Sequence, residues 1–159
     1  MEGNTIMSKK ITVILPNQMK TTENDAVKAE VAAVQKYLDE TDLKLDKPTL
    51  YFVALKGIYT HISRKMELTA VFINCHVKAI SELAATIKLT TDDKDMEIAK
   101  TKIGLPTEFV GDFQPNQALL FNLSIPVRGL TKDRIFEAFQ FKAELENIQI
   151  AEKAEPKED

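Results

Sequence analysis

The spacing of the apolar residues changes once along the chain, and this change restricts the possible folds more than any other feature. Between residues 23 and 40, apolar side chains recur with the period of a helix. From about residue 49 onward they recur at every second position, as on one face of a β-strand. The sequence therefore predicts one helix near the N-terminus, followed by β-structure.

The helix is predicted over residues 23–40. Thr22 is its expected N-cap, because an acidic residue, Asp25, follows three positions later. Small side chains on one stripe suit packing against a flat sheet of the same chain better than binding a partner. The stripe consists of Val27, Val31, Val34 and Leu38.

Short alternating segments follow one another at intervals of roughly ten residues, the spacing of an antiparallel sandwich. The predicted fold is mainly β: an Ig-like antiparallel β-sandwich of about seven strands with one N-terminal amphipathic helix. Residues 11–150 of the 159 form one domain, preceded by a flexible leader at 1–10 and followed by a disordered, charged tail at 151–159. The strands are expected at residues 11–15, 49–55, 66–75, 83–89, 96–101, 119–125 and 139–150.

Polar residues and prolines mark the expected ends of these strands. Residues 91–95 include Asp92, Asp93 and Asp95 but lack the glycine and the distal glutamate of a calcium loop, so we expect a hairpin turn. Pro126 should end its strand or mark an edge, and residues 130–134 should form one helical turn. In the last strand Ile148 and Ile150 fall out of register, which predicts a bulge near Asn147.

Composition excludes several classes of partner and cofactor. The net charge is -3 and the pI about 5.5, which argues against a nucleic-acid binder. No apolar stretch is long enough to cross a bilayer, and no signal peptide is recognised, so we expect a cytoplasmic protein without membrane insertion. One cysteine and two histidines leave no intrachain disulfide and no Cys/His zinc site. We expect no cofactor and no metal.

The sequence carries no motif for catalysis, so we expect a protein that is not an enzyme. Gly-rich phosphate loops and a Gly-x-Ser-x-Gly elbow are both missing. Cys75 and His76 are the only adjacent nucleophile and base, but neighbouring strand residues point to opposite faces. A buried structural Cys75 beside an exposed His76 is the expected arrangement, and the isolated His61 should be partly exposed.

One longer pattern resembles the SLAP domain family. In that family, an Ig-like strand ending in Asn leads into a hairpin with an acidic turn, and a phrase ending in Pro follows. The resemblance covers residues 11–126; the strand at 139–150 lies beyond it, and the chain lacks the terminal Trp of the family. The matching segments are residues 68–74, 83–89, 92–99, 111–115 and 120–126, with Ile80, Leu105 and Phe109.

The resemblance implies a non-catalytic accessory protein of Gram-positive bacteria, linked to surface-layer assembly and to the accessory Sec export route. It assigns no catalytic or binding residues. We expect a protein-interaction module whose partner adds a strand at the last strand, with Phe139, Phe141, Leu145 and Ile148 as contact residues. Two alternatives stay open: a self-associating structural subunit, such as a phage virion component, and a small-ligand binder or enzyme with an unrecognised pocket.

Overall fold

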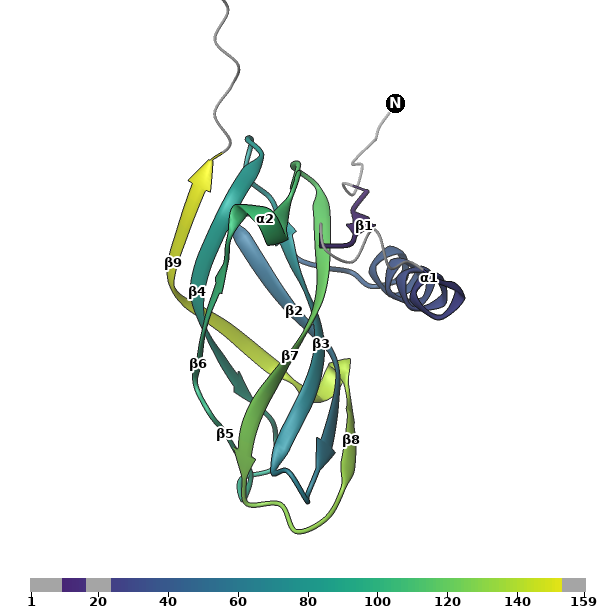
Figure 1. The fold of residues 1–159 in the computed structure, drawn as a ribbon, viewed down its shortest axis with the longest axis vertical. Coiled ribbons are helices and arrows are strands. Elements are labelled where there is room, and N and C mark those ends of the chain that lie inside the picture. Colours follow the sequence, from purple (N-terminus) through teal and green to yellow (C-terminus); the bar gives the residue numbers. More distant parts are fainter. Residues whose placement is uncertain (1–9, 17–23, 153–159) are drawn as a thin grey trace, which may run out of the picture.

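Two β-sheets packed face to face, with one long helix on the outside, make up the computed structural model (Figure 1). It describes residues 10–16 and 24–152. The predicted mainly-β sandwich with a helix near the N-terminus is confirmed. In the described part the strands are β1 (Thr12–Ile14), β2 (Leu50–Thr60), β3 (Lys65–Asn74), β4 (Ile80–Thr90), β5 (Glu97–Ile98), β6 (Thr101–Leu105), β7 (Gln117–Arg128), β8 (Arg134–Glu137) and β9 (Lys142–Glu152). The helices are α1 (Asp25–Glu40), α2 (Thr107–Val110) and the short 3₁₀ helix η2 (Ala138–Gln140).

The larger sheet has the strand order β1-β7-β3-β2-β8, and the short β5 pairs with the end of β7. All its pairs are antiparallel except one: β1 runs parallel to β7, with Val13 opposite Ala118. The expectation of a purely antiparallel sandwich is therefore wrong at this edge. Helix α1 and strands β2 to β6 separate β1 from β7 in the sequence. No short turn therefore fixes the direction of β1 relative to β7, and a parallel pair is possible.

The smaller sheet has the order β6-β4-β9 and packs its apolar face on the larger sheet. Aromatic rings fill the space between the sheets: Phe72 stacks on Phe121 with ring centroids 5.1 Å apart and meets Phe52 edge-on at 5.3 Å. The second half of β3 is buried on both faces, as its continuous apolar run predicts. One face contributes to the space between the sheets and the other lies under the helix side.

Helix α1 covers the outer face of the larger sheet (Figure 1), so its stripe of small residues packs on a sheet as predicted. Val34 and Leu38 are buried against Val71 and Ile73 of β3. The described helix begins later than residue 23: its N-cap is Asn24, whose side chain accepts a hydrogen bond from the amide of Val27 at 2.9 Å. The expected cap, Thr22, lies outside the described residues.

Three strands are longer than the sequence predicts: β4 spans Ile80–Thr90 instead of residues 83–89, and β2 and β7 extend at their ends. β2 continues through Gly57 to Thr60, with a bulge between Ala54 and Lys56. A Cβ at Gly57 would lie 2.5 Å from Met66 Sδ and 2.8 Å from the Phe141 ring, so the glycine serves close packing rather than a turn. β7 continues past Pro126 to Arg128. The amide nitrogen and carbonyl of a strand residue point to the same side, and the Pro126 carbonyl accepts a hydrogen bond from the Ala99 amide. The missing N–H of Pro126 therefore faces away from β3 and costs no hydrogen bond with that strand.

Three predicted local structures are wrong. The single strand expected at residues 96–101 is divided into β5, which pairs with β7, and the start of β6, which pairs with β4 in the other sheet. Residues 91–95 form a polar turn in which Asp93 accepts a hydrogen bond from the amide of Asp95 at 3.0 Å, but the turn does not make a hairpin. It carries the chain from β4 in the smaller sheet to β5, which pairs with β7 in the larger one. The helical turn expected at residues 130–134 is not formed, and Arg134 instead begins β8 at the edge of the larger sheet.

The last strand confirms the predicted bulge and corrects its ends. Asn147 has a φ of 53°, and the pairing with β4 shifts between Gln149 and Glu146 at this point. The strand starts at Lys142, after η2, rather than at residue 139. It continues to Glu152, so residues 151 and 152, predicted as the start of the tail, belong to the strand. Residues 153–159 and residues 1–9 of the predicted leader lie outside the described part.

Candidate interaction surface

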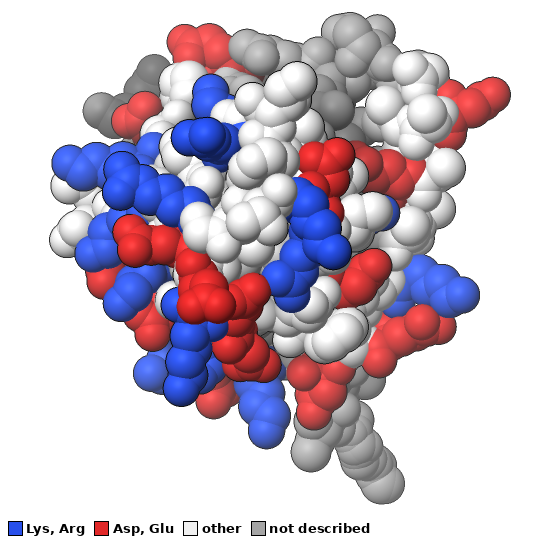
Figure 2. All heavy atoms as spheres, turned by 90° about the horizontal axis from the view of Figure 1, so that it is seen from below, with Lys and Arg blue, Asp and Glu red and all other residues white. Residues whose placement is uncertain are grey.

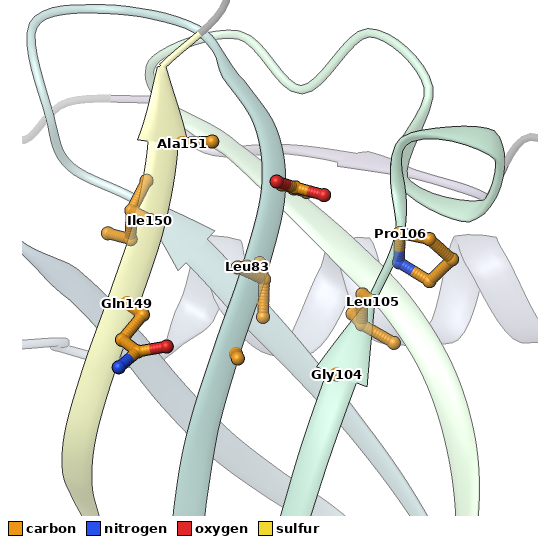
Figure 3. A pocket seen from close by; sticks show the side chains of 9 residues that line it. Leu83, Gly104, Leu105, Pro106, Gln149, Ile150 and Ala151 are labelled. Carbon is orange, nitrogen blue, oxygen red and sulfur yellow. The ribbon is translucent and has the colours of Figure 1, made fainter.

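A shallow groove of about 480 Å³ crosses the outer face of the smaller sheet (Figure 3). Three adjacent strand regions contribute to it: β4, β9, and the end of β6 with the proline that follows. The lining residues Glu82, Gly104 and Gln149 are exposed and face away from the larger sheet, so the groove lies on the outer surface and not between the sheets. It is lined by Glu82, Leu83, Ala84, Gly104, Leu105, Pro106, Gln149, Ile150 and Ala151.

Small side chains create this groove. Ala84 of β4 lies opposite Gly104 of β6 on one side and Gln149 of β9 on the other. A Cβ placed on Gly104 would meet no atom within 4 Å, so the space above it is open. Glu82 is two residues before Ala84 on the same face of β4, and it lies opposite Ala151 of β9. The small side chain of Ala151 leaves the groove open on that side as well.

The remainder of the outer face is covered by charged side chains. Lys100 reaches across to Glu146, with Nζ 2.9 Å from Oε1, and Thr86 beside them is buried although it faces outward. The hydrogen bond and the charge of Lys100 hold the pKa of Glu146 below its ordinary value. The ion pair lies beside Thr86, two residues along β4 from the groove-lining Ala84 on the same outer face.

Strand β9 borders the groove and forms an edge of the smaller sheet. It pairs with β4 on one side, and no described strand pairs with its other side. In Figure 1 it passes from β8 beneath β2 and then rises along the edge beside β4. Its backbone amides and carbonyls on the free side are thus available to an additional strand.

The four predicted contact residues are not brought together. Phe141 and Leu145 pack against the core between the sheets, with the Phe141 ring centroid 5.8 Å from that of Phe136. Phe139 lies in η2 and is 86% exposed, whereas Ile148 follows the bulge and is 37% exposed. Of the four, Phe141 and Leu145 thus belong to the side of β9 that packs on the core, whereas Phe139 and Ile148 are exposed.

A row of exposed apolar residues, of which only Phe139 was singled out from the sequence, runs along the other edge of the molecule. Ile58 of β2 and Ile135 of β8 are cross-strand neighbours on the outer face of the larger sheet, 44% and 57% exposed. Ile62 in the turn after β2 and Phe139 in η2 are more exposed still. We call Ile58, Ile62, Ile135 and Phe139 the β8 row. The sequence signal at β8 is short: the apolar pair Ile135 and Phe136 stands between charged residues.

The two histidines do not meet in one site. His61 Nδ1 lies 3.1 Å from the hydroxyl of the buried Tyr59, in the turn after β2. His76 follows the buried Cys75, and its Nε2 is buried without a hydrogen-bond partner in the described part of the chain. His76 is half-buried, not exposed as predicted, and neither it nor His61 lines the groove.

Figure 2 shows the molecule from below, with acidic and basic side chains intermingled around uncharged areas. Within residues 10–16 and 24–152, no three His, Cys, Asp or Glu side chains converge in a way that could hold a metal ion. No helix in the same residues combines the length and apolarity needed to cross a membrane. Comparison of the chain with protein-family models, with curated proteins and with solved structures finds no match.

Proposed function

We propose that this protein is a non-enzymatic interaction module that binds an extended segment of a partner protein beside β9. Strand addition needs a long edge with free backbone groups, and β9 supplies eleven residues. Main-chain hydrogen bonds would provide affinity, and alternate side chains of the partner would provide specificity.

The observation that carries this proposal is that one strand supplies both the edge and the groove. Gln149 and Ala151 belong to the free-edged β9 and also line the groove. A strand added beside them would place every second side chain on the outer face next to Gln149 and Ala151, from where a long side chain can extend into the groove over Ala84. The free edge of β9 can thus bind the backbone of the segment, and the neighbouring groove can accommodate its side chains.

The resemblance to the SLAP domain family adds a cellular role to the proposal. We propose that the partner belongs to the protein-export or surface-layer assembly machinery of a bacterium and is met in the cytoplasm. Neither the groove nor β9 identifies that machinery, so the identity of the partner rests on the resemblance.

Substitution of Gly104 gives a direct test of the groove. Its backbone does not adopt a positive φ and nothing lies near the missing Cβ, so Gly104→Trp fills the groove without disturbing the core. Gly104→Ser is the matched control, because serine is accommodated but leaves the groove open. Tagged wild type and both variants are used for affinity capture from the native cells, with circular dichroism to verify the fold.

We expect wild type and Gly104→Ser to retain the same partner and Gly104→Trp to lose it. Recovery of export or surface proteins in that set supports the proposed role. A partner retained equally by all three proteins contradicts the groove as the binding site. Truncation after Glu146 is a poorer test, because it also removes Ile150, which packs against the core.

The β8 row favours a second function, that of a self-associating structural subunit. Apolar side chains that gather at a sheet edge commonly mark a protein interface. If two copies meet there, the mass measured by light scattering rises with concentration, and Ile135→Lys returns it to that of one chain. A mass that stays at one chain over a hundredfold range of concentration excludes this function.

A further inference from the structure

The groove beside β9 carries one charged side chain, Glu82. Its eight other lining residues are apolar or uncharged. The other acidic residues that flank the groove are neutralised within the protein: Glu146 by Lys100 at 2.9 Å and Glu152 by Lys78 at 3.5 Å. The carboxylate of the exposed Glu82 has no ion-pair partner among the described residues.

The neighbours of Glu82 leave a path to it from the free edge of β9. Ala151 lies directly opposite Glu82 on β9, and its methyl group is too short to cover the carboxylate. Neighbouring strands lie about 4.8 Å apart, so a strand added beside β9 would lie about 10 Å from the Glu82 backbone. A lysine or arginine side chain has the long, flexible stem needed to reach over Ala151 and meet the carboxylate.

We propose that the segment bound beside β9 carries a lysine or arginine whose long side chain crosses Ala151 and pairs with Glu82. This inference rests on the proposed function and names the partner's chemistry. A second copy of this chain fits the site poorly, because β9 itself would place glutamates there: its outward positions include Glu144 and Glu146. Opposite charges on adjacent strands stabilise a pair, whereas like charges directly opposite destabilise it.

Three capped eight-residue peptides test the inference, alternating valine with lysine, with threonine or with glutamate. Binding to the full-length protein is measured by fluorescence anisotropy at low and high salt. We expect the lysine peptide to bind about two- to five-fold more tightly than the threonine peptide, which is the range for one exposed ion pair. High salt should remove this difference.

Variants of Glu82 assign the preference to this side chain. Glu82→Gln should bind the lysine and threonine peptides equally, and Glu82→Lys should prefer the glutamate peptide. Glu67→Gln is the matched control, because Glu67 is an exposed strand residue on the larger sheet, and it should behave as wild type.

The outcomes separate this inference from the proposed function. If all three peptides bind equally and Gly104→Trp abolishes that binding, the role of Glu82 is overturned and the groove remains the binding site. A lysine preference that persists in Glu82→Gln also overturns it. Absence of binding by every peptide, or binding unchanged by Gly104→Trp, overturns both proposals.

Discussion

Arg134, the first residue of β8, holds Asp93 in the turn after β4, with Nη1 2.8 Å from Oδ2. The same guanidinium lies 4.5 Å from the ring centroid of Phe136. One side chain thus ties the edge strand of the larger sheet to the connection that leaves the smaller sheet. This contact fixes the position of a strand that has only four residues and pairs with β2 alone in the described part.

Replacing Arg134 should change the acid stability of the protein. The hydrogen bond from Arg134, followed by that from the Asp95 amide, holds the pKa of Asp93 below its ordinary value of 3.8. Because the folded-state pKa is lowered, the stabilisation is present above pH of about 4 and is lost as the pH falls through the folded-state pKa. Arg134→Met should raise the pKa of Asp93, as measured by NMR titration of its carboxyl carbon. An unchanged pKa would show that Arg134 does not control this group.

Gln35 should be required for the docking of β1. Its Nε2 donates to the Ile11 carbonyl at 2.7 Å and its Oε1 accepts from the Val13 amide at 2.9 Å. Gln35→Ala leaves both backbone groups without these bonds and should lower the free energy of unfolding by about 1–3 kcal/mol. Urea denaturation measures this loss, and hydrogen exchange at Val13 should quicken. The neighbouring exposed Lys36→Ala should change stability by less than about 0.5 kcal/mol, and equal effects would contradict the prediction.

Alanine substitution should destabilise the protein far more at Phe141 than at Phe139, although the two residues lie two positions apart. Phe141→Ala removes a ring that packs on Phe136 and fills the space beside Gly57, and should cost about 2 kcal/mol or more. Phe139→Ala removes an exposed ring and should stay within about 0.5 kcal/mol. Thermal denaturation of both variants measures the difference. Comparable destabilisation would place Phe139 in the core, contrary to the structure.

Asn147 should tolerate glycine and resist a β-branched residue. Its φ of 53° lies in the left-handed region, which glycine adopts freely and asparagine tolerates. Asn147→Val should cost about 1–2 kcal/mol, whereas Asn147→Gly should be nearly neutral. Chemical denaturation of the two variants is the measurement. If valine is as stable as glycine, the bulge does not depend on this conformation.

The strongest sequence predictions concerned periodic segments. The stripe of Val34 and Leu38 was predicted to pack on a sheet, because which side chains share a face is set within one element. The alternation of Phe141 and Leu145 likewise puts them on one face, but that face was interpreted from the sequence as a partner contact, and the structure packs it on the core. The bulge at Asn147 was predictable for the same reason, since Ile148 and Ile150 break the alternation at that point.

The candidate surface depended on contacts between distant segments. Gly104 and Ala84 form a hollow only because β6 pairs with β4 in one register, and Ile58 meets Ile135 only because β8 joins β2. The turn at residues 91–95 illustrates the limit: its local chemistry was predicted, but the strand that follows it pairs in the other sheet.

The sequence by itself determined the helix, the mainly-β class and the faces of its periodic strands, because side-chain spacing within an element is local. The tertiary structure decided which strands are neighbours, which edges stay open and where small residues gather into a groove. Those outcomes depend on strand order and register, which arise from burying the whole core at once. For this reason Glu82 and Ala151, which are 69 positions apart in the chain, become neighbours, and no local sequence pattern predicts this contact.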